Sequence, residues 1–412
     1  MDKSIFSLSL CADIVFTKKH AVDMMAILSL ICTNPSFHSI IYIVFILYFV
    51  KGSFFMSKGK QKSRVNVKKS KKRLRRKFFI IIPILVLLLA GGAYAAHLYN
   101  KAETAADNAY DDSGKVKSDL REDLVNPDIH NVSILLLGID ENDDRKQKEV
   151  ARSDAMVLAT LNKDEKSIKL LSIPRDSLVY IPEVGYEDKI NHAYAFGEVA
   201  DPPTTGTSAV IDTVENLLEI PVDYYVKLNF NAFIEIIDAI GGITVDVPYA
   251  ISELNSQDQK HSIQLEPGEQ LLYGEEALAL ARTRKQDSDY DRGKRQMEII
   301  DAIIDKSFSI TSVLKYGDMI EALGDNMSTN MTFEDMKSFF SYATQGKGLN
   351  IEKYSLEGYD YWPENIYYWQ VDEVALEETK NKLKAHLDLP TYAESNEDKS
   401  DEYQSAESDY LE

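Results

Sequence analysis

Short apolar runs alternate with amphipathic stretches from residue 132 onward. Residues 133–137, 154–161 and 168–173 are compact apolar runs, and turn-forming residues at 162–167 separate the last two, so they are predicted to form strands with a hairpin. The same reading predicts further strands at 224–228 and 243–247, and helices at 209–218, 232–240, 274–281, 296–308, 312–323 and 333–344. Interleaved strands and helices favour a layered α/β domain with a mixed β-sheet.

A different pattern precedes this domain. Residues 78–98 (FFIIIPILVLLLAGGAYAAHL) contain no Asp, Glu, Lys or Arg, and their length suits a helix that crosses a bilayer. The preceding residues 58–77 carry twelve basic residues and no acidic one, which predicts a cytoplasmic location for that side. A cleaved signal peptide is the alternative, because small residues close the run, but the run is longer than a usual signal segment. The pattern favours a single-pass membrane protein with its larger part outside.

Residues 1–55 fit this organisation poorly. They hold a shorter apolar run at 39–50, whereas Met56 begins a clean basic leader for residues 78–98. Our hypothesis is that translation starts at Met56. Both cysteines, Cys11 and Cys32, lie before it, so we expect neither disulfides nor thiolate metal sites in the exported part.

The chain therefore divides into segments of different character. The formal charge of −20, which persists despite the basic leader, argues against a nucleic-acid partner. The last segment holds eight acidic residues and one lysine, the composition of a disordered tail. The predicted segments are 1–55 (doubtful extension), 56–77 (basic, cytoplasmic), 78–98 (transmembrane anchor), 99–130 (stem), 131–310 (α/β core domain), 311–390 (C-terminal part packed on the core) and 391–412 (acidic tail).

Charged side chains follow or open several predicted strands. Asp140 lies just past the first strand, and Arg175 follows the third. Arg152 and Asp154 lie at the start of the second strand, where residues two apart point to the same face of the sheet. A single arginine after a strand is usually a surface residue. Because ligands of α/β sheets gather at strand ends, several arginines with two aspartates there indicate a candidate site.

A second cluster lies within residues 279–296. Arg292, Arg295 and Gln296 are spaced to share one helix face, and Asp289 or Asp291 is placed to cap that helix. Arg282 and Arg284 precede them and share a face if the chain there is extended. Planar guanidinium groups suit phosphate oxygens, although a solvated helix start with surface ion pairs explains the same pattern.

Together these segments closely resemble the LytR-CpsA-Psr family from about residue 131 to residue 301. The resemblance is carried by LGID, RSDAMVLATLN, LLSIPRDSLVYIP, KINHAYAFG, VDYYVKLNFNAF, IDAIGGITVDVP and GEEALALARTRKQDSDYDRGKRQ. It implies an extracytoplasmic three-layer α/β/α domain, typical of Gram-positive bacteria. It also implies a phosphotransferase that moves a glycopolymer, such as wall teichoic acid or capsule, from undecaprenyl pyrophosphate to peptidoglycan.

The resemblance also implies roles for single residues. Asp140 and Asp154 match an acidic pair that helps to hold Mg²⁺, and Asp289 matches the acidic residue of a D-x-x-R motif. Asp291 stands where the family commonly has glycine. The residues that match pyrophosphate-binding positions are Arg152, Arg175, Arg282, Arg284, Arg292 and Gln296.

The implied chemistry agrees with these residue types. Phosphoryl transfer requires charge neutralisation and positioning, which arginines and a carboxylate-bound Mg²⁺ supply. Asp154 or Asp289 is a candidate base for the attacking hydroxyl, so the predicted catalytic set is Asp154, Asp289, Arg282 and Arg284. Apolar residues of the helices at 210–218 and 230–240 could line a slot for the lipid, although a core role explains most of them. A non-catalytic lipid-pyrophosphate binder that regulates envelope genes is the alternative function.

Overall fold

The computed structural model of this chain describes residues 68–140, 151–200, 204–257, 259–283, 289–307, 326–344 and 350–391. Contacts divide the chain into two compact units, Met1–Leu85 and Val86–Glu412. The fold described below is that of the second unit. The predicted segment 1–55, the predicted tail 391–412 apart from Thr391, the helix predicted at 312–323 and most of the basic leader lie outside the described residues.

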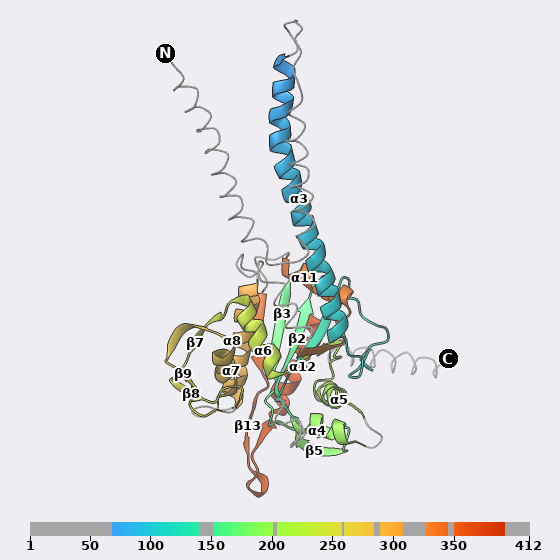
Figure 1. The fold of residues 1–412 in the computed structure, drawn as a ribbon. Helices are drawn as coiled ribbons and strands as arrows, with labels where there is room; N and C mark the ends of the chain where they lie inside the picture. The colour runs from blue at the N-terminus through green and yellow to red at the C-terminus, as the bar shows by residue number, and fades with distance from the viewer. Residues whose placement is uncertain are drawn as a thin grey trace, which may run out of the picture. The chain divides into compact units, whose positions relative to one another are not determined.

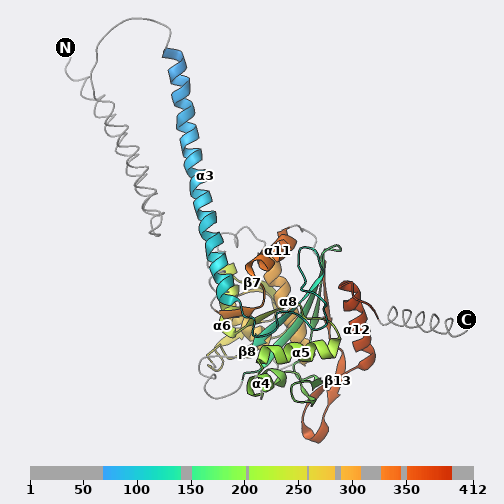
Figure 2. The same cartoon turned by 90° about the vertical axis from the view of Figure 1, so that its right-hand side faces the viewer.

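A six-stranded mixed sheet forms the centre of the domain (Figures 1 and 2). Its order is β11-β6-β1-β2-β3-β12; β1 is antiparallel to β2 and parallel to β6, and β3 is antiparallel to β2 and parallel to β12. The mixed sheet and the β2–β3 hairpin were both predicted and are confirmed. The bounds are β1 Val132–Ile139, β2 Ser153–Asn162, β3 Ser167–Ser172, β6 Tyr224–Leu228, β11 Met327–Thr329 and β12 Asn350–Ser355.

Alternate residues of β1 face two different helix layers, as the period of a strand requires. Leu135 and Leu137 belong to a core shared with α4 (His192–Val199), α5 (Gly206–Leu218) and α12 (Glu373–His386). Leu136 packs in a second core with α8 (Asp289–Ser307) and α11 (Phe333–Thr344). Helices on both faces of the sheet make the three-layer arrangement that the resemblance implied.

A smaller core lies beside the sheet. It joins α6 (Phe230–Ile240), α7 (Gly274–Arg282) and α8 to β7 (Ile243–Val247), β8 (Ile251–Glu253), β9 (Ile263–Leu265) and β10 (Gly268–Leu272). The strand predicted at 243–247 is therefore present, but it pairs with β10 and not with the central sheet. The helix predicted at 232–240 ends at Gly241 as expected, because its φ of 85° is the left-handed conformation that glycine adopts readily.

Two short hairpins lie at the end of the domain that is opposite α11 (Figures 1 and 2). β4 (Leu178–Ile181) pairs with β5 (Tyr186–Lys189), and β13 (Gly358–Tyr361) pairs with β14 (Tyr368–Val371). A 3₁₀ turn, Pro363–Asn365, joins the second pair. The sequence analysis missed both hairpins, because their strands are four residues long and half-polar.

Residues 78–98 lie within a long helix, α3 (Lys68–Ala109). Among the described residues, no helix has the length and apolar character needed to cross a membrane, so the anchor remains a prediction from the sequence. The end of α3 contacts the domain: Ala106 and Ala109 are buried, and the ring of Tyr99 meets that of Phe333 at 5.2 Å. The predicted stem at 99–130 also contacts the domain, through a two-bond ion pair from Arg121 to Asp223.

A buried histidine fixes the end of α12 to the β2–β3 hairpin. The His386 ring lies 2.8 Å from the hydroxyl of Thr160 and 2.7 Å from that of Ser167, and its backbone carbonyl accepts a hydrogen bond from Asn162. Burial, followed by the charge of Lys169, lowers the pKa of His386 against opposing acidic neighbours. The neutral ring is the form that suits this environment, with one nitrogen donating and the other accepting.

This histidine predicts a loss of stability in mild acid. Because the pKa of His386 is lower in the folded protein than in the unfolded chain, the unfolded chain binds more protons as the pH falls below about 6.5. The stabilising effect is complete above that pH and is lost as the pH falls toward the folded pKa. Urea unfolding at pH 7.5 and pH 5.5 should show a larger fall in unfolding free energy for the wild type than for His386→Gln. Equal falls would contradict the assignment.

Candidate functional site

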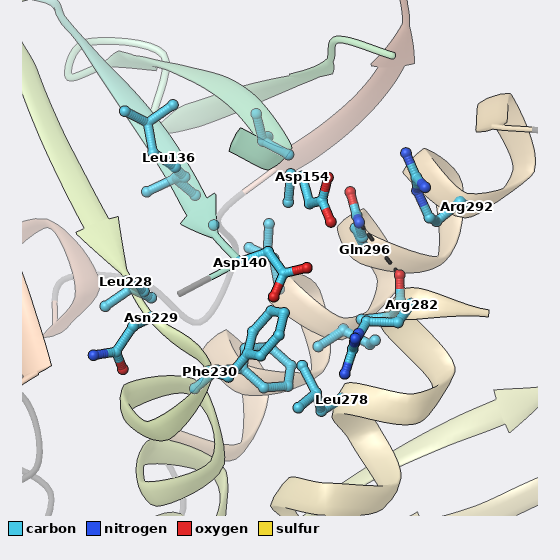
Figure 3. Close-up of a pocket in the computed structure, with 18 of the residues that line it drawn as sticks. Leu136, Asp140, Asp154, Leu228, Asn229, Phe230, Leu278, Arg282, Arg292 and Gln296 are labelled. Carbon is cyan, nitrogen blue, oxygen red and sulfur yellow. Dashed lines mark hydrogen bonds between the residues drawn. The ribbon is translucent and has the colours of Figure 1, made fainter. Parts of the chain in front are cut away.

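A pocket of about 540 Å³ lies at one end of the central sheet, between the strands and helices α6, α7 and α8 (Figure 3). Since β1, β3 and β6 end at this edge and β2 begins there, residues from four strand ends meet. The described residues that line it are Leu136, Leu137, Gly138, Asp140, Asp154, Ala155, Val157, Arg175, Leu228, Asn229, Phe230, Phe233, Glu253, Leu254, Leu278, Ala279, Ala281, Arg282, Arg292, Gln296, Ile299, Ile300 and Ile303.

Six of the predicted site residues line this pocket. Asp140 follows β1, Asp154 lies near the start of β2, and Arg175 lies in the loop after β3. Nη1 of Arg175 is 2.5 Å from Oδ1 of Asp154, so the two oppositely charged groups form an ion pair inside the pocket. The other three, contributed by α7 and α8, are Arg282, Arg292 and Gln296.

Contacts with neighbouring helices orient Arg282 and Gln296. The guanidinium carbon of Arg282 lies 4.5 Å from the ring centroid of Phe230, a cation–π contact that leaves its N–H edge available to other groups. The side-chain amide of Gln296 donates to the backbone carbonyl of Ala281 at 3.3 Å, the contact drawn in Figure 3. α7 and α8 are thereby joined directly beside the pocket.

The buried carboxylate of Asp176 pairs with Arg175 without lining the pocket. Asp176 is 6 % exposed; its Oδ2 is 3.6 Å from Nε of Arg175, and its Oδ1 accepts a hydrogen bond from Lys189 at 2.9 Å. Burial acts to raise the pKa of Asp176, but Lys189 and the charges of Arg175 and Arg292 outweigh it and hold the pKa below its usual value. Asp176 is therefore ionised and offsets part of the positive charge of the site.

The rest of the pocket is apolar. Leu136 and Val157 come from the sheet, Phe233 comes from α6, and Ile300 and Ile303 come from α8. The pocket thus has one end with charged groups and an interior of hydrocarbon side chains, an arrangement that suits an amphipathic ligand with an anionic head. The expectation that the helix at 230–240 contributes to an apolar slot agrees with the positions of Phe230 and Phe233, whereas no residue of α5 lines the pocket.

One arginine of the second cluster has a different role. Arg295 is 5 % exposed, and its guanidinium donates to the backbone carbonyls of Leu280 at 3.1 Å and Thr283 at 2.6 Å. Helical spacing predicted that it shares a face with Arg292 and Gln296, but Arg295 does not line the pocket. Its charge instead satisfies carbonyls at the C-terminal end of α7, where a cation is favourable.

Three predicted residues are not placed in the pocket. Arg152 is exposed and does not line it, although its backbone carbonyl accepts a hydrogen bond from the Asp140 amide at 3.1 Å. Arg284 and the side chain of Asp289 lie outside the described residues; Asp289 begins α8. Asp291, the departure from the family pattern, is half-buried and does not line the pocket.

Other residues of the site were missed in the sequence. Asn229 and Phe230 follow β6 at the same sheet edge, and Asn229 accepts a hydrogen bond from the Ala232 amide as the N-cap of α6. The strand-end argument that selected Asp140 applies equally to them. Glu253 could not be found in this way, because it belongs to β8, which has no clear sequence signal.

Close contact between α8 and β3 sets the position of Arg292 and Gln296. A Cβ atom on Gly293 would collide with the hydroxyl of Ser172 and would lie 3.2 Å from the Ser172 Cβ. Glycine therefore permits this approach of helix to strand without displacing Ser172. The adjacent Arg292 is therefore held close to the strand ends.

The fold and the pocket define a layered α/β protein in which a cluster of arginines and aspartates borders an apolar cavity. The chain belongs to the LytR_cpsA_psr family, whose family model matches residues 94–385. This confirms the family and the mixed α/β fold expected from the sequence.

Curated relatives and solved structures agree with the assignment. The chain is 38 % identical over 301 residues, 72 % of its length, to the polyisoprenyl-teichoic acid–peptidoglycan teichoic acid transferase TagT of Bacillus subtilis, of which the match covers 90 %. A solved structure titled "TagT bound to LIIa-WTA" superposes with a TM-score of 0.56 at 40 % identity, covering 66 % of this chain and 97 % of that one. The structure titled "LytR-CPS2A-psr family protein YwtF (TagT) with bound octaprenyl pyrophosphate lipid" has a TM-score of 0.53 at 37 % identity, covering 67 % and 98 %. The relatives are thus enzymes of the transferase class that the sequence predicted.

The Gly293 contact predicts a specific steric effect. Gly293→Ala should destabilise the protein by about 1–3 kcal/mol, as overpacking of a filled core does. Adding Ser172→Ala removes the colliding hydroxyl and should restore most of that loss. Urea unfolding of both variants and of Ser172→Ala alone measures the coupling, and a Gly293→Ala protein as stable as the wild type would contradict the contact.

Proposed function

We propose that this protein transfers a phosphate-linked glycopolymer from a polyprenyl-pyrophosphate carrier, undecaprenyl pyrophosphate in the cell, to peptidoglycan. The observation that carries the proposal is the pocket itself, in which Arg175, Arg282 and Arg292 meet two aspartates at the mouth of an apolar cavity. A pyrophosphate joined to a long prenyl chain has the matching division between charged and apolar parts. The TagT structure with bound octaprenyl pyrophosphate lipid supports the proposal.

The charged end of the pocket suits phosphoryl transfer. An acceptor hydroxyl oxygen forms a bond to the phosphorus that carries the glycopolymer, and the bond to the bridging pyrophosphate oxygen breaks, so polyprenyl phosphate leaves and a phosphodiester remains. Guanidinium groups of Arg175, Arg282 and Arg292 bind the non-bridging oxygens and stabilise the charge of the transition state. Asp154 accepts the hydroxyl proton in this proposal, with Asp289 as the alternative base.

The two aspartates also fit a magnesium ion. Mg²⁺ usually takes one or two carboxylates and completes its shell with waters and substrate phosphates, so Asp140 and Asp154 would hold it only together with the pyrophosphate. In the described part of the chain, no group of three or more His, Cys, Asp or Glu side chains is placed to hold a metal ion. When bound, the ion would supply further neutralisation of phosphate charge.

We further propose that residues 78–98 anchor the protein in the cell membrane as a single span, with the catalytic domain outside the cytoplasm. The uncharged run and its basic flank, which carries twelve Lys and Arg residues at 58–77, support this proposal. A membrane-bound carrier keeps its prenyl chain in the bilayer, so an enzyme that uses it benefits from a membrane location. The polymer in this proposal is wall teichoic acid or a capsular or other wall polysaccharide.

Removing a charged group from the pocket should abolish transfer without unfolding the protein. Arg282→Ala and Asp154→Ala should each lower the rate of transfer from a lipid-linked glycan to peptidoglycan fragments by about 10²–10³-fold, the size seen when a preorganised charge partner is lost. Arg282→Lys keeps the charge but not the planar fork and should be intermediate. Radiolabelled glycan attached to the acceptor is the measurement.

Lys163→Ala is the matched control. Lys163 makes a long 3.9 Å ion pair with an exposed aspartate and does not line the pocket, so its loss should leave transfer unchanged. If the Arg282 and Asp154 variants also transfer glycan at the wild-type rate, the non-catalytic regulator becomes the better account. Thermal unfolding of each variant shows whether the fold is intact.

Magnesium dependence is a separate expectation. Treatment with EDTA should reduce transfer to near the background rate, and added Mg²⁺ should restore it. Asp140→Asn should raise the Mg²⁺ concentration for half-maximal transfer by about tenfold, because the neutral amide is a weaker ligand. Full activity after chelation would exclude the metal from the proposal.

A further inference from the structure

The β13–β14 hairpin carries an exposed aromatic cluster that the pocket does not use. Tyr359, Tyr361 and Trp362 are 57 %, 42 % and 61 % exposed, and Trp362 lies 4.9 Å from the ring of Tyr367. The hairpin projects from the domain in Figure 1. Large exposed aromatic groups gathered on one short element usually mark a binding surface, since they gain most when a partner covers them.

The base of this hairpin is joined to the charged end of the pocket. The buried Trp369 lies two residues beyond Tyr367 in the chain, about 7 Å at the rise of a strand. Its backbone N–H donates to the carbonyl of Asp176 at 2.8 Å, and its ring stacks on Tyr290 at 6.1 Å, two residues before Arg292. A ligand on Trp362 and Tyr367 is therefore next to the loop and the helix that position Arg175 and Arg292.

The charge of the hairpin restricts the kind of ligand. Asp360 and Glu364 lie in it, Glu357 directly precedes it, and residues 354–379 contain no Lys or Arg. Lys189 contacts the rings of Tyr367 and Tyr368, but its ammonium is paired with Asp176 at 2.9 Å. An acidic surface repels polyphosphates and anionic lipids, whereas carboxylates accept hydrogen bonds from sugar hydroxyls and aromatic faces attract the C–H faces of pyranose rings.

The hairpin also has a defined place within the domain. It lies at the end opposite α11, and α11 is the element that contacts Tyr99 near the end of α3 (Figures 1 and 2). The hairpin and the Tyr99–Phe333 contact therefore lie at opposite ends of the domain.

We propose that the β13–β14 hairpin is a binding platform for the acceptor glycan, a chain of pyranose rings without phosphate groups, and not for the polyanionic donor polymer. Trp362, Tyr361 and Tyr367 stack on sugar rings, and the glycan then leads past Trp369 to the pocket. The inference rests on the proposed function and assigns one of its two substrates to a surface outside the pocket.

Tryptophan emission offers a direct test, because the only two tryptophans of the chain, Trp362 and Trp369, both belong to this hairpin. The full-length protein in detergent is titrated with chitohexaose, a neutral N-acetylhexosamine chain, and binding is followed by emission and by calorimetry. Emission should shift to shorter wavelength on binding. Trp362→Ala should weaken the affinity by about tenfold, whereas Trp362→Phe, which keeps a ring, should retain most of it.

The control is Leu124→Ala, which removes an exposed apolar side chain outside the hairpin and should not change the affinity. Because no cation takes part in binding, raising NaCl from 50 to 500 mM should also leave the affinity unchanged. Absence of chitohexaose binding, or equal binding by Trp362→Ala, would overturn the proposal. So would an emission shift with phosphatidylcholine–phosphatidylglycerol vesicles alone, or salt-sensitive binding of purified teichoic acid that Trp362→Ala abolishes.

Transfer kinetics separate this inference from the proposed function. In the transfer assay, Trp362→Ala should raise the KM for the glycan acceptor by about tenfold while leaving the KM for the lipid donor unchanged. Normal kinetics for both substrates would refute the platform and leave the transferase proposal standing. A wild-type protein that binds chitohexaose through Trp362 but transfers nothing would refute the transferase proposal instead.

Discussion

The balance of charge at the end of the central sheet is the constraint on which the site depends. Arg175 lies between two carboxylates, Asp154 in front at 2.5 Å and Asp176 behind at 3.6 Å. Several guanidinium groups in one partly buried space repel one another. The negative charges of these two carboxylates reduce that repulsion. An entering phosphate would compete with Asp154 for Arg175, while Asp176 keeps its own partners. Asp154 is therefore the carboxylate that a bound phosphate would displace from Arg175.

The sheet brings these groups together through its topology. Because β1 and β6 are parallel and β2 runs between β1 and β3 in the opposite sense, the ends of three strands and the start of a fourth share one edge. α7 and α8 then reach this edge from the other core, held by Arg295 and by the close approach at Gly293. The charged residues thus come from distant parts of the sequence but are fixed by buried, apolar packing.

The sequence predicted the main strands, most of the helices and six of the residues that line the pocket, because strand ends and helix spacing carry clear signals. It did not distinguish Arg295 from Arg292: both have the spacing of one helix face, and only the packing of α7 decides which one is buried on carbonyls. The short strands β8, β13 and β14 were missed, since three or four residues give too little periodicity. Glu253 and the aromatic hairpin were missed with them. Arg152 shows where the argument from strand periodicity fails. It was expected to face the same way as Asp154, but it does not line the pocket.

The closing elements of the sheet come late in the chain. β12 is an edge strand parallel to β3, and α12 fastens the β2–β3 hairpin through His386, yet both lie beyond residue 349. Pairing of partners nearly two hundred residues apart requires closing a long loop, which slows folding. During synthesis, the β3 edge of the hairpin that carries Asp154 stays unpaired until almost the whole polypeptide has emerged. A ribosome that stalls before this point releases a chain with an incomplete sheet, a ready target for chaperones and proteases.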